Sequence, residues 1–381
     1  MAKLGMPTVV VKFIEAGIEA IQRSQRGIVA LILEDTKQAI DKLATKTNGH
    51  EVLPNPFLVY TVDDIPEELS DKNKDYILKA LKGYNKPPLK VVVYMMQQGG
   101  DKAGADRFQE PLKAMLTERF DYLAIPTIET AQLEYVATWV KTARENKFKK
   151  IKVVLPGSNA DYEGVINFGN TKVVTADREY KAAEYTARIA GLVAGTNMTQ
   201  SATYAPLTEV IDCDRHTQDE MDTMVNEGKF FIWYDGEKFK MSRAMNSLVT
   251  TSQGKLEGYQ TIKIVDIMDM IYDDIRKTAQ DSYIGKYTND YENKCLLISA
   301  ILGYFKQLEN ERLLQKDYST CEIDCEAVRT YQLSHGLFTK EELAKMSDDE
   351  VKKLDTKKIV FLKAKVRPLD AMEDIQLPIN I

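Results

Sequence analysis

The sequence predicts an α/β fold, α+β overall, with a layered mixed sheet, covering helices and a C-terminal α+β domain. Three observations support this. Strand-like and helix-like segments alternate through the middle of the chain, the pattern changes after Gly195, and β-prone runs lie near both ends. We therefore expect an N-terminal arm (1–26), an α/β domain (27–195), a C-terminal domain (196–356) and closing strands with an arm (357–381).

The spacing of apolar residues defines the elements of the first half of the chain. β-branched runs predict strands, and apolar residues at helical spacing predict helices. Alternation of the two indicates βαβ units, and hence a mostly parallel sheet with helices over it. Strands are expected at 8–14, 27–33, 56–62, 89–95, 122–125, 151–155 and 172–175, and helices at 70–81, 105–116, 129–145 and 178–194.

The second half contains a hairpin, helices and closing strands. Asp235-Gly236 stands between two β-prone runs, which is a strong hairpin signal. Thr339 with Glu342, and Ser347 with Glu350, fit capping boxes that begin two short helices. Longer helices are expected at 259–279 and 291–314, and strands at 358–366 and 375–381.

Length, composition and charge exclude several classes of protein. The 381 residues exceed one ordinary core, since domains usually contain about 100–200 residues. With 44% hydrophobic residues the chain is globular. The 51 Lys and Arg against 57 Asp and Glu give a net charge of -6, which argues against a general nucleic-acid binder and against direct nucleic-acid contact.

No targeting segment is evident. The N-terminus lacks the apolar run of a signal peptide, so we expect synthesis in a cytoplasm. The charge-free window 189–208 contains Gly, Pro, Asn and Gln and does not resemble a membrane span, so no direct membrane contact is expected. Cys213, Cys295, Cys321 and Cys325 are expected to be buried free thiols.

No motif for catalysis or for cofactor or metal binding stands out. The Gly-Lys pairs at 228, 254 and 285 are not followed by Ser or Thr, so no P-loop is present. The glycines at 99–104 do not have dinucleotide-binding spacing. Cys213 with His216, and Cys321 with Cys325, are poorly spaced for zinc. We expect no catalytic residue, no cofactor and no metal.

Four aspartates form an acidic stripe at 266–274. Asp266, Asp269 and Asp273 fall on one helical face, which superficially resembles a site for a divalent metal. Ile267 and Ile271, with Ile275, occupy the opposite side, as in an ordinary amphipathic helix. We predict a solvated acidic face, or a charge patch between subunits.

The two ends of the chain are the most informative segments. Ile375, Leu377, Ile379 and Ile381 alternate with other residues up to the terminus, and Pro378 restricts such a strand to a sheet margin. Exposed apolar edges are hazards unless they serve strand addition to a neighbour. The alternative is that the terminal strands complete the chain's own sheet. The corresponding N-terminal face consists of Val9, Val11 and Phe13.

The segment 191–207 reads Gly-Leu-Val-Ala-Gly-Thr-Asn-Met-Thr-Gln-Ser-Ala-Thr-Tyr-Ala-Pro-Leu. It resembles the central signature of contractile tail sheath proteins of bacteriophages, phage-like bacteriocins and defective prophage particles. The resemblance extends over nearly the whole chain, in the compact form found in Gram-positive hosts. Further similar segments are 5–7, 24–29, 246–251, the helix 263–275 and the closing stretch 368–375.

The resemblance implies a non-enzymatic subunit made in a bacterial host and built into a virion tail or a released phage-like particle. Its implied partners are copies of itself in hexameric rings stacked helically, an inner tail tube protein, and baseplate and tail-terminator proteins. Contraction would move the subunits as rigid bodies while their arms stay joined, and would drive the tube through a target envelope. The rival hypotheses are an α/β enzyme acting on nucleotides or sugars, and an oligomeric scaffold unrelated to tails.

Two expectations about positions follow. Val9, Val11 and Phe13 of one subunit and 375–381 of another are expected to add to the sheet of a third, while the choice between 358–366 and 375–381 as the donated C-terminal strand stays open. The segment 189–206, with Gly191, Gly195 and Pro206, is expected to form a bend between the α/β domain and the C-terminal domain, because glycine permits unusual backbone angles.

Overall fold

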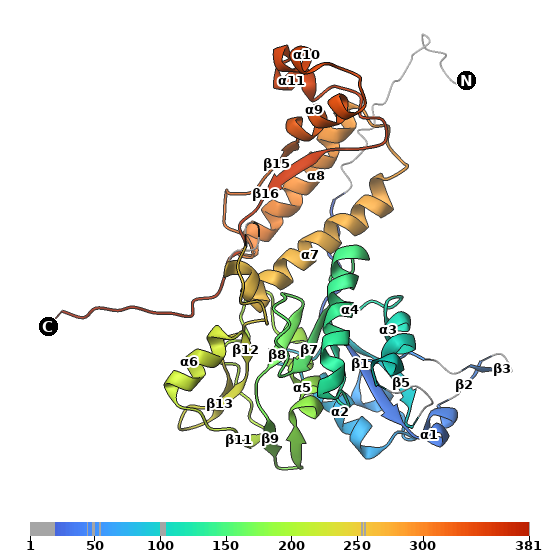
Figure 1. The fold of residues 1–381 in the computed structure, drawn as a ribbon, viewed down its shortest axis with the longest axis vertical. Helices are drawn as coiled ribbons and strands as arrows, with labels where there is room; N and C mark the ends of the chain where they lie inside the picture. Colours follow the sequence, from blue (N-terminus) through green and yellow to red (C-terminus); the bar gives the residue numbers. More distant parts are fainter. Residues whose placement is uncertain are drawn as a thin grey trace, which may run out of the picture. The chain divides into compact units, whose positions relative to one another are not determined.

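The computed structural model describes residues 20–380 except 44, 48–49, 53–54, 100–103, 253 and 255–256. The strand predicted at 8–14, with Val9, Val11 and Phe13, lies outside the described residues, as does Ile381. The chain divides into two units, of which unit 1 comprises Met1–Gln22 and Asp274–Arg367, and unit 2 comprises Arg23–Asp273 and Pro368–Ile381. The mixture of sheets and helices agrees with the predicted fold class (Figure 1).

A seven-stranded mixed sheet forms the centre of unit 2. Its strand order is β12-β8-β7-β6-β1-β5-β4, and all neighbours run parallel except β4, which is antiparallel to β5. Helical crossovers join β1 to β5, β5 to β6 and β6 to β7, as parallel pairing usually requires, whereas β7 and β8 are joined by residues 157–164 without a helix. The strands are β1 (Ile28–Asp35), β4 (Phe57–Val59), β5 (Lys90–Gln97), β6 (Tyr122–Ala124), β7 (Lys152–Pro156), β8 (Val165–Phe168) and β12 (Lys229–Phe230).

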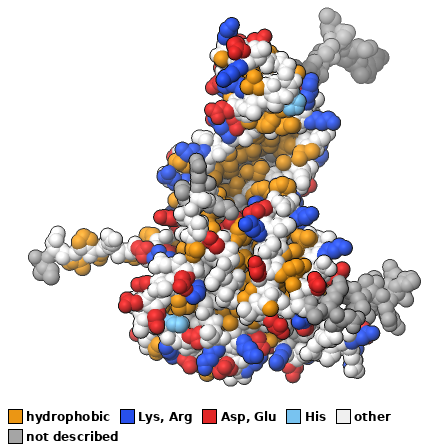
Figure 2. Space-filling view, in the orientation of Figure 1, with side chains coloured by type: hydrophobic (Ala, Val, Ile, Leu, Met, Phe, Trp, Pro, Cys, Tyr) orange, Lys and Arg blue, Asp and Glu red, His pale blue; other side chains and the backbone are white. Residues whose placement is uncertain are grey.

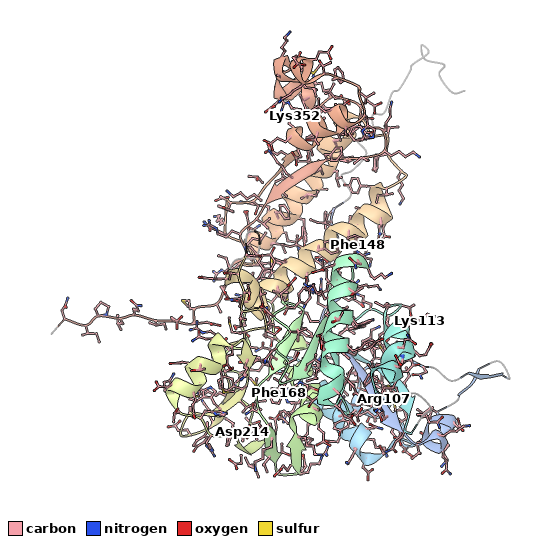
Figure 3. All side chains as sticks on the ribbon, in the orientation of Figure 1. Arg107, Lys113, Phe148, Phe168, Asp214 and Lys352 are labelled. Atoms are coloured by element: carbon pink, nitrogen blue, oxygen red, sulfur yellow. The ribbon has the colours of Figure 1, made fainter. Side chains whose placement is uncertain are left out.

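Helices cover both faces of this sheet (Figure 1). Alternate β1 residues enter two different apolar clusters, one shared with α2 (Asp71–Leu81) and α5 (Ala182–Ala194), the other with α3 (Gln109–Met115) and α4 (Leu133–Asn146). Phe168 stacks on Tyr185 of α5 with ring centroids 6.2 Å apart (Figure 3). Strands buried on both faces explain why the sequence shows continuous apolar runs here.

Smaller elements complete unit 2. The predicted hairpin is confirmed, because β13 (Ile232–Tyr234) and β14 (Phe239–Met241) pair across Asp235-Gly236, where Gly236 has φ 101°. A three-stranded sheet has the order β10-β9-β11. The remaining elements are α1 (Lys37–Lys42), β2 (Thr45–Thr47), β3 (His50–Val52), β9 (Lys172–Thr175), β10 (Glu179–Lys181), β11 (Val210–Cys213), α6 (Gln218–Asn226), and the 3₁₀ turns η1 (Val62–Asp64), η2 (Gly104–Phe108), η3 (Thr130–Gln132) and η4 (Glu257–Gln260).

Unit 1 is mostly helical. Helix α7 (Ile262–Thr278) runs across the division after Asp273 and is followed by the π-helical turn η5 (Ala279–Tyr283) and α8 (Tyr291–Asn310). Both predicted capping boxes are present, at Thr339 before α10 (Lys340–Lys345) and at Ser347 before α11 (Asp348–Val351). The other elements are β15 (Thr320–Ile323), α9 (Cys325–Ser334) and β16 (Leu362–Lys365).

The division into units differs from the domain boundaries expected from the sequence. We expected boundaries after 26, 195 and 356, whereas the units divide after 22, 273 and 367. The change of pattern after Gly195 marks the end of α5 and not the end of a unit, because the small sheets after it belong to unit 2. None of the helices in the described part of the chain has the length and apolarity that a bilayer crossing requires.

Candidate assembly interface

The residues 375–380, here called the C-terminal arm, extend from unit 2 without forming a helix or strand. The side chains of Ile375, Leu377 and Ile379 are 82%, 75% and 75% exposed. Figure 2 shows this segment projecting from unit 2 with hydrophobic side chains along it. Residues 375–380 form no strand within the single chain, because a strand needs a hydrogen-bonded neighbour. The strand expected at 375–381, added to a neighbouring subunit, stays a prediction.

A two-stranded sheet in unit 1 has unused edges. Strands β15 and β16 pair in antiparallel register from Thr320↔Lys365 to Ile323↔Leu362. Ile323 packs in a small apolar cluster with Val328 and Val351. Within the described residues no third strand joins this sheet. Another strand could therefore add at either edge of this sheet. Such an addition would stabilise the sheet, because two strands alone are only marginally stable.

The acidic stripe of α7 is not a solvated face, so the prediction for it was wrong. Asp269 is only 3% exposed, and the side chain of Asp266 is 19% exposed. Arg144 of α4 donates to both Asp269 oxygens at 2.8 and 2.9 Å, and Lys152 of β7 reaches Asp269 at 2.7 Å and Asp266 at 2.9 Å. The stripe therefore fastens α7 to the sheet of unit 2 through buried ion pairs.

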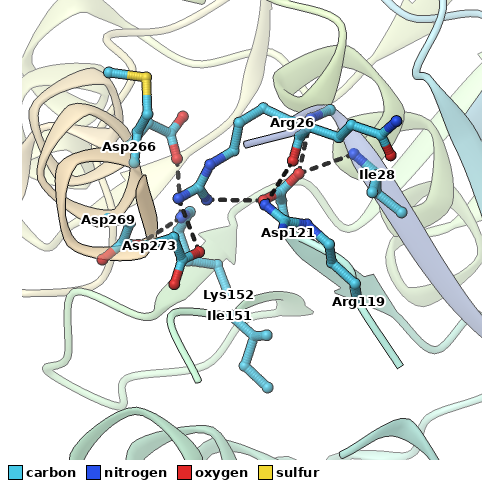
Figure 4. A network of polar contacts seen from close by, with 12 residues as sticks. Arg26, Ile28, Arg119, Asp121, Ile151, Lys152, Asp266, Asp269 and Asp273 are labelled. Atoms are coloured by element: carbon cyan, nitrogen blue, oxygen red, sulfur yellow. Dashed lines mark hydrogen bonds and ion pairs between the residues drawn. The ribbon is translucent and has the colours of Figure 1, made fainter. Parts of the chain in front are cut away.

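Arg26 extends this network toward the start of β1. Its guanidinium donates to Asp121 at 2.8 Å and to Asp273 at 2.9 Å, and Asp121 also accepts from the backbone N–H groups of Gly27 and Ile28 (Figure 4). The signal that could have revealed the network is Lys152, a lysine inside an otherwise apolar strand. A buried cation in such a position requires an acidic partner.

The pKa values of Asp266 and Asp269 are shifted in opposite directions. Burial alone raises the pKa of a carboxyl group, but Lys152 and Arg144 outweigh it at Asp269 and lower its pKa to about 2. At Asp266 burial prevails over Lys152, so its pKa is raised. The Tyr122 hydroxyl donates to both Asp266 oxygens at 2.5 and 2.6 Å, and burial raises the Tyr122 pKa well above its ordinary value.

Two family descriptions match most of the chain. Residues 101–247 match the phage tail sheath protein central domain, and residues 255–381 match the phage tail sheath C-terminal domain. The chain belongs to the phage tail sheath protein family. It is also 32% identical to the tail sheath protein of Clostridium phage phiCD119 over 99% of both chains. Membership of this family overturns the alternative of a scaffold unrelated to tails.

Solved structures share the fold of this sheath protein. The sheath tail protein from Desulfitobacterium hafniense has a TM-score of 0.68 at 19% identity, covering 83% of this chain and 94% of that one. The helical sheath of the anti-feeding prophage in its contracted state has a TM-score of 0.68 at 13% identity, covering 99% of both chains. At these identities the likeness establishes the fold alone.

The expected bend of the sheath protein lies within unit 2. Gly191 is inside α5, where an added Cβ would lie 2.0 Å from the Ala80 carbonyl oxygen, so this glycine permits the close approach of α5 to α2. Gly195 ends α5, and Pro206 makes an isolated antiparallel bridge with Lys240. A bend at these residues remains a prediction, and the division between units falls elsewhere.

Polar groups at the carboxyl end of β1 in the sheath protein are engaged with one another. Open α/β sheets bind ligands at the edge formed by the carboxyl ends of their strands. Strand β1 lies inside the sheet, with β5 and β6 as its neighbours. Glu34 pairs with Arg107 and accepts from Thr127 at 2.7 Å, and Asp35 accepts from Ser70 and Asn73, both at 2.8 Å. Side chains and the Ser70 backbone N–H of the chain itself thus occupy these acceptors.

Three of the four cysteine thiols of the sheath protein are buried. Burial raises the pKa of the Cys213 thiol to about 12 and that of Cys321 to about 11. Cys325 is buried as predicted, whereas Cys295 is partly exposed. Across the described ranges, no group of three or more His, Cys, Asp or Glu could hold a metal ion.

Proposed function

We propose that the chain is the structural subunit of a contractile tail sheath that polymerises helically around an inner tube and contracts to drive it through a target envelope. The observation that carries this proposal is that a member of the sheath family exposes an apolar C-terminal arm and also has a two-stranded sheet that no third strand joins among the described residues. A donor strand and an acceptor sheet on one chain suit repeated strand addition between copies.

In this proposal the C-terminal arm of one subunit adds to the β15–β16 sheet of another. Main-chain hydrogen bonds would join the strands, and the alternate side chains of the arm would be covered. Burying Ile375, Leu377, Ile379 and Ile381 would contribute on the order of 6–12 kcal/mol before the ordering entropy is subtracted. The N-terminal residues Val9, Val11 and Phe13 are proposed to join the same kind of sheet in a further copy.

The names of similar proteins support the rest of the assembly. One relative is named a tail sheath protein, and structural neighbours are described as a contracted helical sheath and as a baseplate. We infer that this subunit forms hexameric rings stacked into a sheath, contacts an inner tube protein, and meets baseplate and tail-terminator proteins at the two ends. Such a subunit is made in the host cytoplasm and works in a virion tail or a released phage-like particle.

The test is deletion of 375–381. Purified wild-type protein is expected to form striated tubes by negative-stain microscopy, whereas the deletion variant should remain as single subunits or short oligomers, since it lacks the donor strand. Leu377→Asp should behave like the deletion, because burying a carboxylate without a partner is costly. Asn380→Asp, which adds a charge to the opposite side of the arm, is the matched control and should assemble. Normal tubes from the deletion variant, with an unchanged circular dichroism spectrum, would refute the proposal.

A further inference from the structure

We propose that Ser201, Thr203 and Arg243 form a receptor for the carboxylates of Glu373 and Asp374, here called the arm latch. The latch holds the root of the C-terminal arm on its own subunit, so that only residues from Ile375 onward are free to be donated. This inference rests on the proposed donation of the arm, and it adds a site that fixes where donation begins.

Two hydroxyl groups are already oriented toward Glu373. Its Oε1 accepts from Thr203 Oγ1 at 2.5 Å and from Ser201 Oγ at 3.1 Å. Thr203 Oγ1 itself accepts from the Ala244 backbone N–H at 2.9 Å, and Ser201 Oγ accepts from the Thr203 backbone N–H at 3.1 Å. Because each hydroxyl has a single proton, these backbone donors leave that proton free for the carboxylate.

Without the carboxylate, this arrangement loses its acceptor. The two hydroxyl oxygens lie 2.8 Å apart, so one could then donate only to the other. The receptor is thus complete only when Glu373 is in place. Hydrogen bonds to an ionised acceptor are roughly twice as strong as those between neutral groups.

Arg243 completes the latch from the other side. Its Nε lies 3.4 Å from Glu373 Oε2, and its Nη2 lies 2.5 Å from Asp374 Oδ1. The hydrogen bond from Arg243 lowers the pKa of Asp374. Lys263, which is 6% exposed, adds positive charge: burial lowers its pKa, while Asp370 and Glu373 act in the opposite direction. Glu373 and Asp374 thus lie beside two cationic side chains, those of Arg243 and Lys263.

Glu373 is the one shielded side chain between exposed neighbours. Its side chain is 15% exposed, whereas Met372 is 94%, the Asp374 side chain 75% and Ile375 82% exposed. The contacts of Glu373 are therefore the last shielded point before the C-terminal arm. Strand β16 of unit 1 ends at Lys365, and the chain belongs to unit 2 again from Pro368. Only a short segment therefore separates β16 from the latch.

The latch would prevent a pull on the donated arm from reaching β16 of the same subunit. Tension on the arm would reach β16 through the chain if the root were free, and β16 is one of the two strands proposed to accept a neighbour's arm. With Glu373 held, tension passes instead into the 201–203 segment and Arg243 of unit 2. A subunit can then be pulled by its arm without unpairing its own acceptor sheet.

Hydrogen–deuterium exchange of the full-length, unassembled subunit tests the latch. In Glu373→Ala and Arg243→Ala, the amides of 369–374 should exchange about 10-fold faster or more, as expected for loss of charge-assisted hydrogen bonds. Glu373→Gln, which keeps an acceptor for the hydroxyls but loses the ion pair, should be intermediate. Met372→Gln, on the same segment and at a side chain that is 94% exposed, is the matched control and should exchange like wild type.

The outcome is separable from that of the arm deletion. Unchanged exchange at 369–374 in both alanine variants would overturn the latch, even if deletion of 375–381 abolishes tubes and so upholds the proposed function. Faster exchange confined to 369–374 would support the latch even if the arm deletion left assembly intact. Faster exchange spread over all of unit 2 would also overturn it, because it would mean that these residues only stabilise the fold.

Discussion

Asp266 and Asp269 lie about one helical turn apart on α7 and respond in opposite ways to the same buried cations. Ion pairs of this network join Asp121, Asp266, Asp269 and Asp273 to Arg26, Arg144 and Lys152. Asp269 has two cationic partners and a lowered pKa, whereas Asp266 shares Lys152 and has a raised one. Asp269 therefore carries most of the pairing, and the charge of Asp266 is a surplus beside a lysine that Asp269 already holds.

This difference predicts unequal effects of the same substitution. At pH 7, Asp269→Asn should lower the free energy of unfolding by about 3–5 kcal/mol, because two buried cations lose their carboxylate. Asp266→Asn should cost less than about 1 kcal/mol, since an amide oxygen still accepts from Tyr122 and Lys152 and the surplus charge disappears. Urea unfolding followed by circular dichroism measures both, with the exposed Asp219→Asn on α6 as control. Equal losses from the two substitutions would contradict the pairing described here.

At the scale of the element, the C-terminal arm shows why a local pattern does not always form its structure. Alternation from Ile375 to Ile379 predicts a strand, yet the segment has no neighbour to pair with in one chain. In a strand the backbone groups of 376, 378 and 380 point to one edge, and Pro378 has no N–H to offer there. The odd-numbered residues keep a complete edge, so the arm should pair on that edge only.

Pro378→Ala should therefore remove a restriction on pairing. With both edges able to bond, the arm is expected to recruit further strands, so that light scattering rises and irregular aggregates accompany the tubes. Asn380→Ala, which keeps its backbone N–H, is the control and should give tubes alone. If Pro378→Ala assembles like wild type, proline has no role in limiting the arm to a sheet margin.

Local signals predicted many elements and missed the contacts between them. The apolar run of β1, the Asp235-Gly236 hairpin and the capping boxes at Thr339 and Ser347 depend on neighbouring residues, and all appear as expected. Strand β8 and helix α6 were missed because β8 is a very short run and α6 is mostly polar. The α7 network and the arm latch join residues more than 100 positions apart, which periodicity does not report.

At the scale of the whole molecule, charge and exposed apolar surface occupy different parts of the chain. The net charge is -6, but the arm 375–380 contains no ionisable side chain. The contacts proposed to join subunits are therefore mostly apolar and main-chain contacts. Such contacts respond to temperature more than to ionic strength, because hydrophobic stabilisation weakens on cooling and is not screened by salt.

Self-assembly should accordingly depend weakly on salt. Raising NaCl from about 0.05 to 0.5 M shortens the screening length several-fold, yet the polymer fraction measured by sedimentation should change less than about 2-fold. Cooling should lower it. The variant lacking 375–381 shows the background at both salt concentrations. Loss of most polymer at high salt would mean that ion pairs, and not the arms, hold the subunits together.

Each of the two units is built from segments that lie far apart in the sequence. The chain passes from one unit to the other after residues 22, 273 and 367. A proteolytic cut near residue 273 would give two fragments, and each would still hold a piece of both units. The first fragment keeps the Gln22 backbone N–H on Thr278, and the second keeps Glu373 on Thr203. The two fragments would thus contact each other within both units, and we expect these contacts to hold the cut subunit together.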